Sequence, residues 1–148
     1  MFYSVRSALD LGISEETQID ILDFVCGYTI YHAMVPGKVE TYNIVLDFGN
    51  TSLIEIPINM LRIVAQRLKQ SYKLRVHNIV AVNVDWRIKY ACNFLYKILD
   101  PRLTDKIKIL SDNGSSYFTS VTSKDRIQRK YGGSLPDKNG DFFPPRYN

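Results

Sequence analysis

The sequence has no long hydrophobic run: no stretch approaches the roughly 20 apolar residues that a helix needs to cross a bilayer. Arg6 and Asp10 interrupt the N-terminal stretch, where a secretory signal needs continuous apolar residues. The two cysteines, Cys26 and Cys92, lie far apart and lack the C-x-x-C or Cys/His spacing of a zinc site. We therefore expect two reduced thiols, no metal and a cytoplasmic protein.

The sequence also lacks the common catalytic signatures. It has no G-x-S-x-G elbow, no G-x-x-x-x-G-K-[ST] loop and no G-x-G-x-x-G. The Asp-Phe-Gly triplet at 47–49 matches the magnesium-binding triplet of protein kinases, but the other parts of a kinase are missing. The histidines are His32 and His77. These absences argue against an enzyme, and a small hydrolase that pairs Cys26 with His32 stays open as a minor alternative because it requires that the two side chains meet.

The composition is that of one folded domain spanning residues 1–148, with 45% hydrophobic and 23% charged residues. The formal net charge of +4 favours anionic partners such as acidic lipid surfaces or nucleic acid. The densest basic clusters are Arg62, Arg67, Lys69, Lys73 and Arg75, and then Lys124, Arg126, Arg129 and Lys130. Neither cluster has interleaved aromatic residues or a recognition-helix motif, so we expect no nucleic-acid partner.

Short apolar runs alternate along the chain with segments of helical periodicity. Strands are expected at residues 2–9, 41–48, 77–83 and 106–110. Helices are expected at residues 14–34, 58–72 and 84–99, with short helical turns at 116–121 and 124–130. This alternation predicts an α/β fold with a mostly parallel β-sheet flanked by helices. The proline-rich residues 136–148 are expected to form an extended C-terminal tail.

The segment VDWRIKYACNFLYKILDP, residues 84–101, predicts an amphipathic helix with aromatic residues on its polar face. At about 100° per residue, one side collects Ile88, Ala91, Cys92, Leu95, Ile98 and Leu99. The opposite side collects Trp86, Lys89, Tyr90, Asn93, Tyr96 and Lys97. Rings with polar tips beside long charged stems suit a boundary between water and an apolar phase. The same rings could instead cover neighbouring parts of the protein.

A family resemblance rests on three blocks of the sequence. They are NIVLDFGNTS at 43–52, NIVAVNVDWRIKYACNFLYKILDPRLTDKIKIL at 78–110, and RKYGGSLP at 129–136. In order and spacing these blocks resemble the CRAL-TRIO lipid-binding family, to which phosphatidylinositol transfer proteins and tocopherol- and retinaldehyde-binding proteins belong. The most specific part runs from Asn83 through the amphipathic helix to Lys106.

The resemblance implies a deep apolar pocket for a single lipid, gated by a mobile helix at residues 85–99. It implies a peripheral membrane protein with no catalytic residue and no cofactor, the bound lipid being the ligand. The pocket and gate residues that it implies are Thr41, Asn43, Ile88, Ala91, Cys92, Leu95 and Lys106. The residues that it implies for membrane contact are Trp86, Lys89, Tyr90 and Tyr96.

The sequence departs from the family at the headgroup residues, at Gly49, which is only two residues after Asp47 where the family has Asp-x-x-Gly, and at its N-terminal side. Members that bind phosphatidylinositol pair the lysine equivalent to Lys106 with a glutamate, and this sequence has Leu74 there. Lys106 can still hold a phosphate through a charge-assisted contact, and Thr41 and Asn43 align with positions that hold phosphocholine in some members. Members also carry a helical lobe and a strand before the position of Phe2. The chain is thus a fragment, a domain of a longer protein or a minimal member, and other domains or chains would complete its N-terminal side.

The sequence leads to one hypothesis and one alternative. The hypothesis is non-enzymatic binding or transfer of a single hydrophobic ligand, a phospholipid or another lipid, with transient contact to a membrane surface. The alternative is a protein-interaction module built on the same scaffold without lipid exchange. Pocket volume separates them, because a filled interior predicts protein partners and an open interior predicts lipid.

Overall fold

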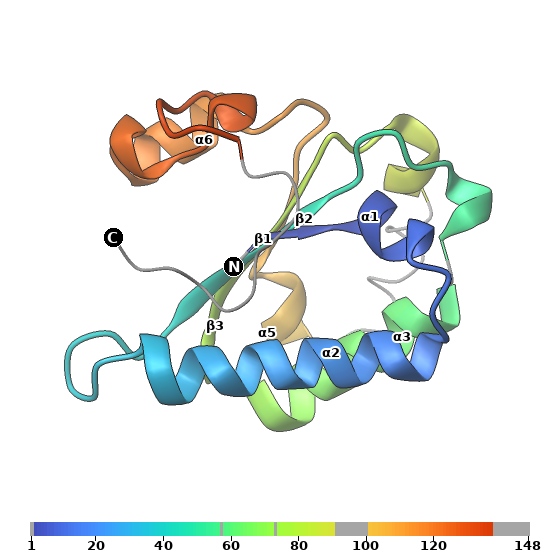
Figure 1. The fold of residues 1–148 in the computed structure, drawn as a ribbon, viewed down its shortest axis with the longest axis horizontal. Helices are drawn as coiled ribbons and strands as arrows, with labels where there is room; N and C mark the ends of the chain where they lie inside the picture. Colours follow the sequence, from blue (N-terminus) through green and yellow to red (C-terminus); the bar gives the residue numbers. More distant parts are fainter. Residues whose placement is uncertain (1, 57, 73, 91–100, 138–148) are drawn as a thin grey trace. The chain divides into compact units, whose positions relative to one another are not determined.

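The fold is built on a sheet of four parallel strands. The structure is a computed structural model that describes residues 2–56, 58–72, 74–90 and 101–137. The strands are β1 (Phe2–Ser4), β2 (Tyr42–Asp47), β3 (Val76–Val82) and β4 (Ile107–Ile109), adjacent in the order β1-β2-β3-β4 (Figure 1). All three strand pairs are parallel, and helices separate the strands along the chain. The predicted α/β fold with a parallel sheet is confirmed.

The chain divides into two compact units, residues 1–110 and 111–148, and the sheet lies in the first. The expectation of one domain over residues 1–148 stays a prediction. Residues 138–148, most of the expected tail, lie outside the described residues. No helix in the described part of the chain is long and apolar enough to span a bilayer.

Two helices of the first unit cover one face of the sheet. Helix α2 (Glu15–Tyr28) begins after Ser14, whose hydroxyl accepts a hydrogen bond from the Thr17 amide at 3.2 Å, and it continues as a π-helix over Thr29–Ala33. Helix α3 (Ile58–Arg67) continues as a π-helix over Leu68–Tyr72. Figure 1 shows α2 running along one side of the sheet. Both helices lie where the sequence predicts them.

The core of this unit lies on both faces of the sheet. On the helix-covered face, Leu22 and Cys26 of α2 pack with Leu68 and with the strand residues Ile44 and Ile79. Successive strand residues point to opposite faces, and the alternate residues Val45, Val80 and Val82 are buried as well. Burial on both faces explains why the strands read as continuous apolar runs in the sequence.

The N-terminal strand is shorter than predicted. The sequence suggests a strand over residues 2–9, but β1 ends at Ser4 and helix α1 (Val5–Asp10) follows. Ser4 caps this helix, because its hydroxyl accepts a hydrogen bond from the Ser7 amide at 3.3 Å. An ion pair of 2.8 Å between Arg6 and Asp10, one helical turn apart, further favours the helix. Residues 5–10 therefore form a capped helix, although their loose apolar alternation predicts a strand.

The second unit is organised around buried aromatic rings. It contains α6 (Ser115–Val121) and 3₁₀ turns over Lys124–Arg126 and Arg129–Tyr131, as expected for residues 116–130. The Tyr131 ring is buried and packs edge-on against Phe118, with ring centroids 5.7 Å apart. Gly132 follows with φ +87°, and a Cβ on Gly133 would collide with the backbone carbonyl of Ile127. The close packing at Gly132 and Gly133 thus leaves no room for a Cβ, which explains the two glycines after Tyr131.

Candidate functional site

The predicted headgroup residues lie together at the amino end of the sheet. Thr41 and Asn43 are exposed at the start of β2, where Tyr42 is in register with Val76 of β3. Lys106, just before β4, donates a hydrogen bond from Nζ to the carbonyl oxygen of Val76 at 2.7 Å. The parallel register therefore brings all three predicted residues to one edge, although their roles in binding stay predictions.

The residue that replaces the family's glutamate does not join this group. Leu74 lies in the turn before β3, and its side chain is exposed. Its neighbour Arg75 donates a hydrogen bond to the carbonyl oxygen of Glu40 at 3.3 Å. Position 74 therefore contributes no carboxylate to this end of the sheet.

The predicted gate begins at the opposite, carboxyl end of the sheet. Asp85 caps the helix that begins at Trp86, since its Oδ1 accepts a hydrogen bond from the Ile88 amide at 2.8 Å. The side chain of Ile88 is 2% exposed, whereas those of Trp86 and Tyr90 are 74% and 78% exposed. The Arg87 guanidinium lies 5.3 Å from the centre of the Trp86 ring, a cation–π contact.

The two faces of this first helical turn agree with the periodicity of the sequence. Ile88 belongs to a buried cluster with Val5, Phe48 and Ile56, and Lys89 is exposed. The other predicted gate residues, namely Ala91, Cys92, Leu95 and Tyr96, lie outside the described residues. The structure thus describes the start of the predicted gate, where one apolar side chain enters the core and two aromatic rings face outward.

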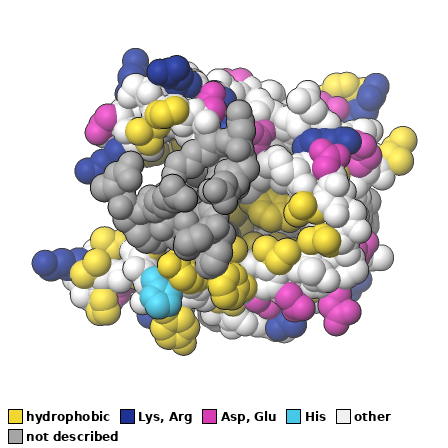
Figure 2. All heavy atoms as spheres, in the orientation of Figure 1, with side chains coloured by type: hydrophobic (Ala, Val, Ile, Leu, Met, Phe, Trp, Pro, Cys, Tyr) yellow, Lys and Arg dark blue, Asp and Glu magenta, His cyan; other side chains and the backbone are white. Residues whose placement is uncertain are grey.

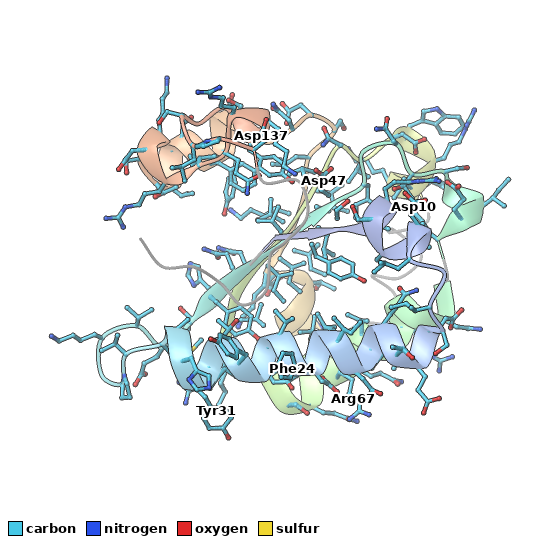
Figure 3. All side chains as sticks on the ribbon, viewed as in Figure 1. Asp10, Phe24, Tyr31, Asp47, Arg67 and Asp137 are labelled. Atoms are coloured by element: carbon cyan, nitrogen blue, oxygen red, sulfur yellow. The ribbon has the colours of Figure 1, made fainter. Side chains whose placement is uncertain are left out.

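A polar junction that the sequence analysis does not identify holds the carboxyl ends of β2 and β3. The Oδ1 atom of Asp47 accepts hydrogen bonds from the Gly49 amide at 2.9 Å and from the Asn83 amide side chain at 2.8 Å. Asn83 has φ +56°, in the left-handed region. Figure 3 shows Asp47 at the end of the strands, away from Phe24 and Arg67 on the helices. Because Asn83 immediately precedes the segment of Asp85 and Trp86, this junction fixes where the helix starts.

The cysteine and histidine of the alternative hydrolase hypothesis do not meet. The Cys26 side chain is fully buried beside Tyr42, and burial raises the pKa of its thiol. His32 is exposed, and its ring stacks on Tyr28 with centroids 4.5 Å apart. Within the described residues, no hydrogen bond joins Cys26 to a histidine. A protonated thiol without a base cannot act as a nucleophile.

The first unit also contains a small cavity near the end of α2. It has a volume of about 80 Å³ and is lined by Ile30, Met34, Pro36, Val39, Glu40 and Arg75. Pockets for drug-sized ligands have volumes of roughly 300–1,000 Å³, so this cavity is too small to be the predicted lipid pocket. Most of the helix predicted to gate that pocket lies outside the described residues. In the described ranges, no group of histidine, cysteine and acidic side chains is arranged to hold a metal ion.

These features define an α/β domain with a parallel sheet, polar residues at its amino end and an amphipathic helix after its third strand. The CRAL/TRIO domain family matches residues 4–133, and the chain belongs to this family. The family is one of lipid-binding and lipid-transfer proteins. Among solved structures, the chain is similar to the crystal structure of Sfh5, with 20% sequence identity and a TM-score of 0.54.

The likeness to Sfh5 covers 63% of this chain and 34% of the Sfh5 chain, so it supports the fold. The chain matches about a third of the length of that protein. No curated protein sequence matches the chain significantly.

Proposed function

We propose that this protein binds a single lipid in an apolar pocket and exchanges it with membranes, with helix 85–99 as the gate. The observation that carries the proposal is the first turn of that helix, where Ile88 is buried while Trp86 and Tyr90 are exposed. Membership of the CRAL/TRIO family supports the same function. The proposed function needs no catalytic group and no cofactor, because the lipid itself is the ligand.

The energetics of this function come from burial and from interfacial contact. Each buried methylene of a lipid contributes about 0.8 kcal/mol to binding, so shape and length of the pocket decide affinity. Amphipathic rings and snorkelling cations are favoured at the headgroup layer of a membrane. In this proposal, Trp86, Lys89 and Tyr90 contact that layer transiently, and Tyr96 follows on the same predicted face.

The distance between the predicted headgroup residues at the amino end of the sheet and the start of the gate at its carboxyl end constrains the length of the ligand. β3 has seven residues and joins the Lys106 edge to the start of the gate, and at about 3.3 Å per residue it is roughly 20 Å long. A ligand that contacts both ends must be extended over this length, as a long-chain lipid is. We propose that Lys106, with Thr41 and Asn43, recognises a phosphate group, because the carboxylate that accompanies this lysine in inositol-binding members is absent at Leu74.

A protein-interaction function is the second candidate. On α2 and the π-helix that follows it, the side chains of Phe24 and Tyr31 are exposed large hydrophobic groups that project from the helix (Figure 3). Such groups are typical of protein contact surfaces. This candidate predicts no bound lipid.

Native mass spectrometry of the purified full chain tests the main proposal. We expect a co-purifying lipid mass, or an added lipid mass after incubation with phosphatidylcholine vesicles, that is removed by organic extraction. If the chain shows only its own mass under both conditions, lipid binding is rejected and the protein-interaction candidate is favoured.

Trp86→Ala should slow lipid transfer more than it weakens lipid binding. Loss of the exposed ring removes interfacial contact of about 1 kcal/mol, so the transfer rate between vesicles should fall about fivefold. Equilibrium binding of a fluorescent phospholipid should change less than twofold. Tyr31→Ala removes an exposed ring on the π-helix after α2 and serves as the matched control, with neither value altered. Equal losses in rate and binding for Trp86→Ala would mean that the ring supports the fold or the pocket instead.

A further inference from the structure

The second unit carries an exposed patch of cationic and apolar side chains. We call it the basic patch, and it consists of Val121, Lys124, Arg126, Arg129, Lys130 and Leu135. All six side chains are exposed, including the hydrophobic Val121 at 57% and Leu135 at 41%. Figure 2 shows apolar side chains on this unit bordered by Lys and Arg side chains, with some carboxylates between them.

Backbone hydrogen bonds hold the parts of the basic patch together. The amide of Leu135 donates to the carbonyl oxygen of Ile127 at 2.9 Å, and the amide of Arg129 donates to the carbonyl oxygen of Leu135 at 2.9 Å. The amide of Ser134 donates to the carbonyl oxygen of Lys124 at 2.8 Å. Ile127 is buried. The apolar Leu135 is therefore fixed beside the basic segment and is not part of a separate loop.

The cations of the basic patch have no acidic partners within the described residues. Among residues 2–56, 58–72, 74–90 and 101–137, no carboxylate lies within 4 Å of the four ammonium and guanidinium groups. The Lys130 ammonium lies 4.9 Å from the centre of the Tyr131 ring. The two acidic residues nearby bind elsewhere. The Asp125 carboxylate is hydrogen-bonded by the Ser123 side chain and by its own backbone, and these bonds, with a smaller contribution from the charge of Arg126, lower its pKa. Asp137 accepts a hydrogen bond from the Lys130 amide at 2.9 Å. Positive charge is thus left for an external partner.

We propose that the basic patch docks the protein onto an anionic phospholipid surface. Four exposed cations, none of which lies within 4 Å of a carboxylate of the described residues, are complementary to a layer of acidic headgroups. The exposed Val121 and Leu135 can enter the boundary between headgroups and acyl chains. The exposed Val121 and Leu135 add apolar surface to the charge of the basic patch. This docking needs no lipid pocket, so it can be tested independently of the proposed transfer function.

Sedimentation of the full chain with vesicles tests this proposal. Vesicles of equal parts phosphatidylcholine and phosphatidylserine should bind the protein, and raised salt should weaken the binding. Each cation near such a surface contributes about fivefold, so the double variant K124Q/R129Q should partition about 25-fold more weakly. The matched control K38Q/R62Q removes the same charge from exposed positions of the first unit and should bind within about threefold of the unchanged chain.

Three outcomes would overturn the proposal. Unchanged binding of K124Q/R129Q would exclude the basic patch, and equal losses for the two double variants would show a simple effect of net charge. For the apolar part of the patch, we expect Leu135→Ser to weaken vesicle binding, and the third overturning outcome is the opposite result. If Leu135→Ser has no effect while a polyglutamate peptide competes fully with the vesicles, the basic patch is a site for acidic protein segments. Thermal unfolding of each variant should match that of the unchanged chain, because the replaced side chains are exposed.

Discussion

Gly133→Ala should lower the free energy of unfolding of the second unit by about 3 kcal/mol. An added methyl group would overlap the carbonyl group and the Cβ of Ile127, which is buried. Neither neighbour can move easily, because the carbonyl oxygen of Ile127 accepts a hydrogen bond from the Leu135 amide at 2.9 Å. Hydrogen exchange read by mass spectrometry should show lost protection across residues 111–137.

Gly27→Ala is the matched control for this substitution. Gly27 lies within α2, and a Cβ built there meets no atom within 4 Å. Alanine is favoured over glycine in a helix interior by about 0.5–1 kcal/mol, so this variant should be slightly more stable. If Gly133→Ala keeps the protection of residues 111–137 while Gly27→Ala behaves as expected, the close packing at Gly133 is not a constraint on the fold.

Asn83→Ala should destabilise the first unit by about 3 kcal/mol. The substitution removes a hydrogen bond to the Asp47 carboxylate, and hydrogen bonds to charged groups contribute about 1.5–3 kcal/mol. It also places alanine at φ +56°, a conformation that costs roughly 1 kcal/mol for residues with a Cβ. Urea denaturation followed by far-UV circular dichroism measures the change.

Two further variants separate these contributions. Asn83→Gly restores the backbone freedom and should recover only the part of the loss that arises from the positive φ. Asn50→Ala changes an exposed asparagine with φ +57° that makes no such bond to a carboxylate, so it measures the backbone part alone. If Asn83→Ala is no worse than Asn50→Ala, the bond to Asp47 does not stabilise the junction.

Most of the fold follows from the sequence because its apolar residues have clear periodicity. The runs around Ile44 and Ile79 predict buried strands, and Ser14 with the acidic residues after it predicts the start of α2. The sequence gives no signal for the π-helix over Thr29–Ala33. Its hydrogen bonds span five residues in place of four, which rotates the later side chains relative to α2, and Ala33 at its end is exposed.

The candidate site is predictable only in part. Periodicity places Ile88 inward and Trp86 outward, because residues two positions apart lie on opposite sides of a helix. The Asp47–Asn83 junction joins residues 36 positions apart, so no local pattern contains it. It depends on the parallel register that sets Asp47 opposite Val82. One signal for the junction exists in the sequence, because a polar residue stands at the end of each of the two apolar runs. The carboxyl ends of parallel strands meet at one edge of the sheet, so these two polar residues are expected to lie close together.

The parallel register has a consequence for how fast the protein reaches its native state. Val45 is in register with Phe2 and with Val80, and Val80 with Lys108, so every pairing closes a loop of about 30 to 40 residues. Such non-local pairing makes folding slower than that of a helical bundle, in which most contacts are local. During synthesis, the apolar β2 leaves the ribosome before β3, so its β3-facing edge stays unpaired and prone to aggregation for that interval.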